Sequence, residues 1–120
     1  MIRKLNYGEI WLANLDPSSG TEAGKIRPVL IVQNQILLDI EHPSTLIIPL
    51  TTNLINNAEP LRVRVNAQEK LLKNSDLLID QLRAIDNKRL TGSPLVKLDC
   101  KLMAKVREAI SEILGHSINS

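Results

Sequence analysis

The sequence predicts an α+β fold that is mostly β, with several short strands followed by one C-terminal helix. Three observations lead to this prediction. Short apolar segments that alternate or run together recur between residues 8 and 85, as is typical of strands. Turn-forming residues separate these segments. From about residue 99 the apolar spacing changes to the helical period. Short strands in this number favour a small antiparallel barrel or a strongly twisted sheet.

The first two predicted strands are joined by a long loop. Residues 8–16 are rich in apolar residues and end at an Asp-Pro turn. Residues 29–32 form a continuous apolar run, as expected for a strand covered on both faces, with Pro28 at its first position. The ten-residue connection 17–26 exceeds the usual length of about 4 to 6 residues, and such loops often carry function.

Three more strands are predicted further along the chain. Residues 45–52 form the third, in which Pro49 should force an edge position or a bulge. Residues 61–65, LRVRV, alternate strictly. This alternation should direct one set of side chains to the core and two arginines outward: Leu61, Val63 and Val65 inward, Arg62 and Arg64 outward. Residues 77–85 form the fifth strand, with Gln81 and Arg83 on the same face.

The predicted C-terminal helix begins near Asp99 and ends at Gly115. Its apolar stripe should pack on the sheet and consists of Leu98, Leu102, Val106, Ala109, Ile110 and Ile113.

Length and composition indicate one domain, residues 1–120. The chain has 120 residues, of which 43% are hydrophobic and 23% charged, which suffices for one modest core. Aromatic residues make up only 2% and Phe is absent, so base-stacking platforms with several exposed rings are disfavoured. The net charge of +2 permits an anionic partner without requiring one.

The sequence also indicates a cytoplasmic protein. The single cysteine, Cys100, excludes an internal disulfide and suits a reducing compartment, and we expect its thiol to be inert. The longest apolar runs are far shorter than the roughly 18 residues of a membrane span. The first residues contain no apolar segment of a signal peptide.

Few residues could carry chemistry. His42 and His116 stand singly, and nothing in the sequence places them together, so neither a metal site nor an acid/base pair is predicted. Glu22 lies in the long loop, Arg27 directly follows it, and Thr51-Thr52 ends the third predicted strand. Spacing alone favours an ordinary surface ion pair, which contributes at most about 1 kcal/mol. The alternative is a clamp for a phosphodiester, made by a guanidinium and neighbouring hydroxyls.

Three sequence blocks bear on this choice. The segment GEIWLANLDPSSGTEAGKIRPVLIVQN resembles the N-terminal signature of the MazF/PemK toxins of bacterial toxin–antitoxin systems. The later segments IIPLTTN and DQLRAIDNKRL resemble two further blocks of that family, in the same order. Three ordered blocks are more specific than any one of them, and together they extend the resemblance over roughly residues 8–114.

The resemblance implies an SH3-like barrel with a C-terminal helix, acting as a homodimer that cleaves single-stranded RNA without a metal or other cofactor. By matching positions it makes Arg27 and Thr51 catalytic and Glu22 a loop glutamate that is either a base or an orienting group. The residues expected to bind substrate are Gln81, Arg83, Thr52 and Lys25, of which Lys25 occupies a variable position of the family.

The resemblance also implies a protein partner, a cognate antitoxin whose acidic, disordered tail covers the active groove. Such a tail would suit a basic surface, for which the candidates are Arg27, Arg62, Arg64 and Arg83. Two other functions stay open on fold grounds. One is a gyrase-binding toxin of the CcdB type, which has a similar barrel and no nuclease site. The other is a non-catalytic module that binds RNA or protein.

Overall fold

The computed structural model describes residues 3–16, 20 and 25–115. The elements in chain order are β1 (Glu9–Asn14), β2 (Ile26–Ile31), α1 (Gln35–Asp39), β3 (Ser44–Thr51), β4 (Arg62–Val65), β5 (Ser75–Leu78), the 3₁₀ helix η1 (Ile79–Gln81), β6 (Arg83–Asp86), the 3₁₀ helix η2 (Asn87–Arg89), β7 (Leu90–Lys97) and α2 (Cys100–Ile113). The mostly β composition with one long C-terminal helix confirms the predicted fold class. No helix in the described part is long and apolar enough to cross a membrane.

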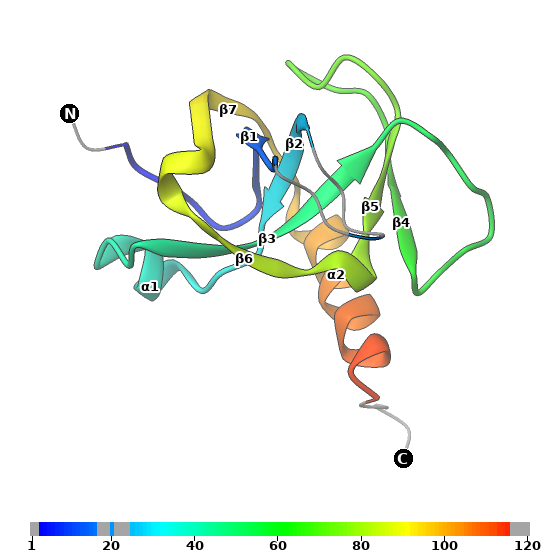
Figure 1. The fold of residues 1–120 in the computed structure, drawn as a ribbon. Helices are drawn as coiled ribbons and strands as arrows, with labels where there is room; N and C mark the ends of the chain where they lie inside the picture. Colours follow the sequence, from blue (N-terminus) through cyan, green and yellow to red (C-terminus); the bar gives the residue numbers. More distant parts are fainter. Residues whose placement is uncertain (1–2, 17–19, 21–24, 116–120) are drawn as a thin grey trace.

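The strands form one antiparallel sheet in the order β4-β5-β3-β2-β1-β7, and β6 pairs separately with β3 (Figure 1). Within the described residues β4 and β7 end this order, so the sheet is not closed into a barrel. The central strands β2 and β3 therefore have neighbours on both sides, and the candidate site lies at one end of this pair.

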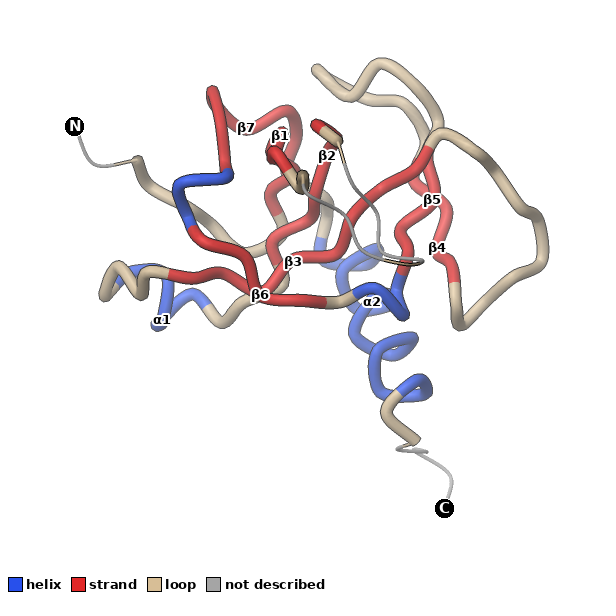
Figure 2. The backbone as a smooth tube through the Cα atoms, in the orientation of Figure 1, coloured by secondary structure: helices blue, strands red, loops and turns tan. Residues whose placement is uncertain are grey.

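The central strands are buried on both faces. Consecutive residues of β2 alternate between two apolar clusters, with Leu30 in one and Val29 and Ile31 in the other. The first cluster includes Met103 and Val106 of α2, which lies against one face of the sheet (Figure 2). Burial on both faces explains the continuous apolar runs of these strands.

The helix α2 begins and ends where its sequence predicts. The Asp99 side chain accepts a hydrogen bond from the Leu102 backbone N–H at 2.8 Å, which caps the first turn. Gly115 follows the helix with a positive φ of 83°, the conformation that ends many helices.

Strand β2 starts earlier than predicted, so Pro28 is its third residue rather than its first. The carbonyls of Lys25 and Ile31 accept hydrogen bonds from Leu15 and Gly8 on the β1 side. The backbone N of Pro28 therefore faces β3, at a position before the pairing with β3 begins at Val29. No donor is needed there, so Pro28 fits inside the strand.

The predicted fifth strand is divided into two, β5 and β6. Both pair with β3, but the three-residue helix η1 separates them. On β3 the interruption lies at Ile48 and Pro49, between the residues paired with β6 and those paired with β5. Because proline lacks the N–H for a ladder bond, the pairing breaks there, inside the sheet rather than at an edge.

Besides the two 3₁₀ helices, two elements were not predicted, and one residue was misplaced. The short helix α1 and the strand β7 are both absent from the sequence-based assignment; β7 contains Gly92 and Pro94, which are typical of a turn. Its register against β1 shifts between Ile10 and Leu12, which accommodates these residues. Leu61 was expected in the core but is 52% exposed, because it belongs to the turn before β4.

Candidate active site

A pocket of about 240 Å³ lies where β2 begins and β3 ends. Its lining comprises Lys25, Ile26, Arg27, Pro28, Leu50, Thr51, Thr52 and Ser75. Four of the residues predicted to act on substrate therefore share one pocket. Arg27 and Thr51 belong to the neighbouring strands β2 and β3, which fixes their relative positions, and Lys25 and Thr52 lie directly beside these strand ends.

Arg27 is the second residue of β2 and lies opposite Ala13 of β1. It is half-buried, and its Nη1 donates a hydrogen bond to the backbone oxygen of Leu50 at 3.4 Å. Leu50 directly precedes Thr51, so this contact holds the guanidinium beside the end of β3. The ring of Pro28 restricts the backbone next to Arg27 and further limits its motion.

Thr51 is the last residue of β3 and is also half-buried. Its Oγ1 accepts a hydrogen bond from the Asn53 backbone N–H at 3.2 Å. Accepting this bond does not use the hydroxyl proton, which can therefore be donated to a phosphate oxygen. The pocket thus combines a permanent positive charge with a hydroxyl donor, a combination suited to a phosphodiester.

The remaining predicted residues divide into three groups. Lys25 and Thr52 are exposed and line the pocket with Arg27. Gln81 and Arg83 do not line it and do not share one strand, because Gln81 ends η1 and Arg83 begins β6 opposite Ile47. Glu22 lies outside the described residues.

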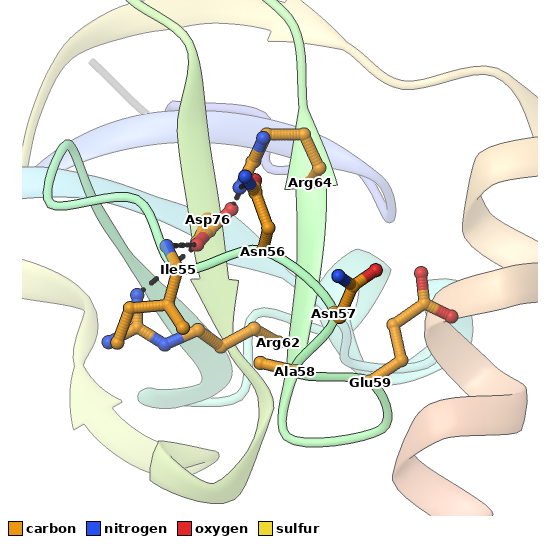
Figure 3. Close-up of a pocket in the computed structure, with 8 residues that line it drawn as sticks. All are labelled: Ile55, Asn56, Asn57, Ala58, Glu59, Arg62, Arg64 and Asp76. Carbon is orange, nitrogen blue, oxygen red and sulfur yellow. Dashed lines mark hydrogen bonds and ion pairs between the residues drawn. The ribbon is translucent and has the colours of Figure 1, made fainter.

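Beside this pocket lies an ion cluster that the sequence analysis missed. Asp76 of β5 is 1% exposed and accepts hydrogen bonds from Arg64 Nε at 2.5 Å, Ile55 N at 2.9 Å and Arg62 Nη1 at 3.2 Å. Figure 3 shows the carboxylate of Asp76 between these donors. The two arginines of β4 were expected to face outward. They do lie on the face away from Val63, but both are half-buried and form ion pairs with Asp76.

The electrostatics of Asp76 follow from these contacts. Burial raises the pKa of its carboxyl group, but the hydrogen bond from Arg64, that from the Ile55 backbone, that from Arg62 and the attraction of Arg64 together lower it below the usual 3.8. Asp76 is therefore ionised near neutral pH. The only sign of this cluster in the sequence was the acidic residue of the segment SDLL, which could pair with an arginine of LRVRV. Recognising the pair requires the strand register that places Arg64 opposite Asp76.

The residues that the structure describes contain no group of three or more His, Cys, Asp or Glu that could hold a metal ion. His42 is exposed and His116 lies outside the described part. Cys100 is exposed in the first turn of α2.

Comparison with known proteins agrees with the fold and the motifs. Residues 6–114 match the family described as PemK-like, MazF-like toxin of type II toxin-antitoxin system. The chain is 39% identical to an endoribonuclease MazF of Staphylococcus saprophyticus, over 97% of both chains. It is 34% identical to the endoribonuclease EndoA of Bacillus subtilis, over 86% of this chain and 88% of that one.

Solved structures show the same fold at lower identity. A MazF crystal structure from Deinococcus radiodurans has a TM-score of 0.79 at 21% identity, covering 95% of this chain and 99% of that one. An endoribonuclease in complex with its cognate antitoxin from Mycobacterial species has a TM-score of 0.71 at 19% identity, covering 97% and 98%.

Proposed function

Because the chain belongs to the family of PemK-like, MazF-like toxins of type II toxin–antitoxin systems, we propose that it is a sequence-specific, metal-independent endoribonuclease that cleaves single-stranded RNA. The observation that carries the proposal is the meeting of Arg27 and Thr51, from neighbouring strands, in one pocket. Two curated relatives above 30% identity are named endoribonucleases, which supports this reading.

The proposed reaction starts with attack of a ribose 2′-oxygen on the adjacent phosphorus. A base takes the 2′ proton, a phosphorane with added negative charge forms, and the 5′-oxygen leaves with a proton. The products are a 2′,3′-cyclic phosphate and a 5′-hydroxyl. Use of the 2′-hydroxyl as nucleophile explains selectivity for RNA over DNA.

Arg27 and Thr51 have distinct roles in this scheme. The guanidinium of Arg27 stabilises the charge that develops on the phosphorane oxygens and is the candidate donor of the leaving-group proton. The hydroxyl of Thr51 holds a phosphate oxygen by a hydrogen bond. Both side chains start from strand positions, so little reorganisation is needed when the transition state forms.

Glu22 is assigned to the same reaction from the sequence resemblance. It either accepts the 2′ proton or orients Arg27. Lys25 and Thr52, which line the pocket, are assigned to binding of the RNA next to the cut. Gln81 and Arg83 are assigned to RNA contacts outside the pocket.

The proposed setting follows from the family. The chain would act in the cytoplasm as a homodimer formed by its single domain, and a cognate antitoxin would neutralise it with an acidic, disordered tail. One structure of the same fold is an endoribonuclease in complex with its cognate antitoxin, which supports this assignment. A gyrase-binding toxin of the CcdB type and a non-catalytic binding module are not favoured, because neither requires the combination of Arg27 and Thr51.

One experiment separates these functions. The purified chain is incubated with mixed single-stranded RNA in EDTA, and the fragments and their ends are sequenced. We expect discrete fragments with 2′,3′-cyclic phosphate (or the 3′-phosphate from its opening) and 5′-hydroxyl ends. Fragments with 5′-phosphates, or activity lost on chelation, would contradict the proposed reaction. Uncleaved RNA would instead favour the gyrase-binding toxin or the non-catalytic binding module.

A further inference from the structure

A second pocket of about 490 Å³ includes the ion cluster of Asp76, Arg62 and Arg64 (Figure 3). It is enclosed by the loop after β3 and by β4 and β5, and is lined by Ile55, Asn56, Asn57, Ala58, Glu59, Arg62, Arg64 and Asp76. The two pockets are related through β5, which supplies Ser75 to the first and Asp76 to the second. Asp76 also lies opposite Thr51 on the neighbouring strand.

The second pocket presents two oriented guanidinium groups. The side chains of Arg62 and Arg64 are 19% and 34% exposed, and both bind the buried Asp76 carboxylate. A guanidinium has five N–H donors, more than the bonds to Asp76, Asn53 and Asn56 engage. With Asp76 the two arginines carry a net charge of +1. Glu59 points away toward α2, where it pairs with Lys105 at 2.9 Å.

Asp76 also fixes the loop that follows Thr51. Its carboxylate accepts the Ile55 N–H, while Arg62 donates to the Asn53 carbonyl and Arg64 to the Asn56 side chain. One buried carboxylate therefore holds both arginines and, directly or through them, three loop residues. Loss of its charge would release the cations and the loop together.

We infer that this second pocket is a phosphate-binding subsite for the RNA nucleotide next to the scissile bond, and that Asp76 is the residue that positions its two arginines. The inference rests on the proposed function and adds to it a subsite and a positioning residue. An arginine held from behind by a buried carboxylate loses little side-chain freedom when a phosphate binds in front of it. The amide groups of Asn56 and Asn57 in the lining can hydrogen-bond the ribose or a base edge.

RNA is favoured over an acidic peptide as the occupant because of where the pocket lies. Its residue Asp76 lies opposite Thr51 of the first pocket, so a polymer with a phosphate at each residue can reach both sites. The planar guanidinium also matches two oxygens of a phosphate.

The substitution Asp76→Asn tests the inference through the sign of its effect. It removes a negative charge beside the proposed RNA path, so long-range electrostatics alone would tighten RNA binding. Positioning by Asp76 requires the opposite. We expect KM for a cleavable RNA oligonucleotide to rise about tenfold, with kcat changed less, because the effect is on binding outside the reacting atoms. Glu108→Gln is the matched control, because it removes the same charge from an exposed position of α2 and should not raise KM.

Two further variants cover the case in which Asp76→Asn does not fold. Arg62→Lys and Arg64→Lys preserve charge but lose the planar fork, and each should raise KM. Lys101→Arg, a charge-preserving exchange at an exposed position of α2, should not. Binding of a fully 2′-O-methylated RNA, which lacks the nucleophile, reports the subsite separately from cleavage. Arg62→Gln should reduce the slope of log K against log salt by about 0.7, the value for one phosphate of single-stranded RNA.

The outcomes are decisive in both directions. A parent chain that binds methylated RNA but cleaves nothing would contradict the proposed function and leave the subsite testable. Unchanged or tighter RNA binding by a folded Asp76→Asn, or unchanged KM for both lysine variants, would overturn the inference. So would variants that lose affinity for a glutamate-rich peptide while RNA binding is unaffected, because the pocket would then be a peptide site.

Discussion

Thr51 and Asp76 lie directly opposite each other on the antiparallel strands β3 and β5. The proposed catalytic hydroxyl and the carboxylate of the ion cluster therefore belong to one cross-strand pair. Their side chains form hydrogen bonds with other groups, Thr51 with Asn53 and Asp76 with Ile55 and two arginines. Because the side chains of directly opposite residues lie close together, the ion cluster lies beside the end of β3. Variants of Asp76 should therefore change both stability and RNA binding, whereas variants of Arg27 should change activity alone.

Arg27→Ala should lower kcat by about 10²-fold or more, the usual effect of losing one group that stabilises transition-state charge. The fold should persist, because Arg27 is half-buried and is not part of either apolar cluster. Single-turnover cleavage of RNA measures the loss, and circular dichroism verifies the fold. Arg107→Ala, a change at an exposed position of α2, is the control. Normal cleavage by Arg27→Ala would remove this pocket from consideration.

Thr51→Ala should also lower kcat by about 10²-fold, since it deletes the hydroxyl assigned to a phosphate oxygen. Thr51→Ser keeps that hydroxyl and should recover most of the rate. Thr91→Ala serves as the matched control, because Thr91 is exposed on β7 and pairs with Leu12 away from the pocket. If the serine variant were as slow as the alanine variant, Thr51 would act through packing and not through its hydroxyl.

Glu22→Gln should cost less activity than Arg27→Ala if Glu22 only orients the arginine, and this is the outcome we expect. The amide keeps the size and hydrogen-bonding capacity of the side chain but cannot accept the 2′ proton. The pH dependence of kcat/KM provides the second measurement, because a general base adds an acidic limb that the variant loses. A loss equal to that of Arg27→Ala would identify Glu22 as the general base.

Four predicted site residues line one candidate pocket, and the sequence could indicate them because they belong to contiguous motifs. Arg27 and Pro28 precede an apolar run, and Thr51 ends another, so both positions followed from strand boundaries and the resemblance. The pairing of β2 with β3 then brings them together. The predicted strand boundaries were less accurate. At Pro28 the start of β2 depends on whether the proline nitrogen, which carries no hydrogen, faces a paired neighbouring strand, and the sequence alone does not show this.

The ion cluster could not be predicted in the same way. Arg64 and Asp76 are separated by a long connection between β4 and β5, and only the register of that hairpin places them opposite each other. Strand β7 was missed for a related reason, because Gly92 and Pro94 are tolerated only through a local shift against β1. These features depend on pairing between distant segments, which one sequence does not specify.

Asp76 should make stability depend on acidic pH. Its pKa is lower in the folded protein than the ordinary 3.8, so the folded state binds this proton less tightly than the unfolded state does. The stabilisation is therefore fully present well above pH 3.8 and is lost as the pH falls below this value through the folded pKa. Removing one partner of a buried ion pair costs about 3–5 kcal/mol, so Asp76→Ala should lower the free energy of unfolding on that scale at neutral pH.

Urea unfolding between pH 7 and pH 2.5 measures this dependence. The difference in unfolding free energy between the parent chain and Asp76→Ala should shrink toward the acid end. Asp99→Ala is a useful comparison, because it removes a helix cap worth about 1 kcal/mol at an exposed site. A difference for Asp76→Ala that stays constant over the whole range would show that packing, not the charge, is what the variant loses.

The antitoxin and the RNA should compete for the same basic surface. Arg27, Arg62 and Arg64 line the two pockets, and a tail rich in carboxylates would neutralise the same guanidinium groups that hold phosphates. We expect a homodimer in solution, and inhibition of cleavage by the product of the neighbouring antitoxin gene that weakens as salt rises. Screening acts here because the Debye length falls from about 10 Å at 0.1 M to 3 Å at 1 M.

Arg62→Gln should weaken RNA and antitoxin binding together, whereas Arg107→Gln should affect neither. Sedimentation and competition binding measure both parts; a strictly monomeric active enzyme contradicts the first, and an antitoxin that binds without displacing RNA contradicts the second.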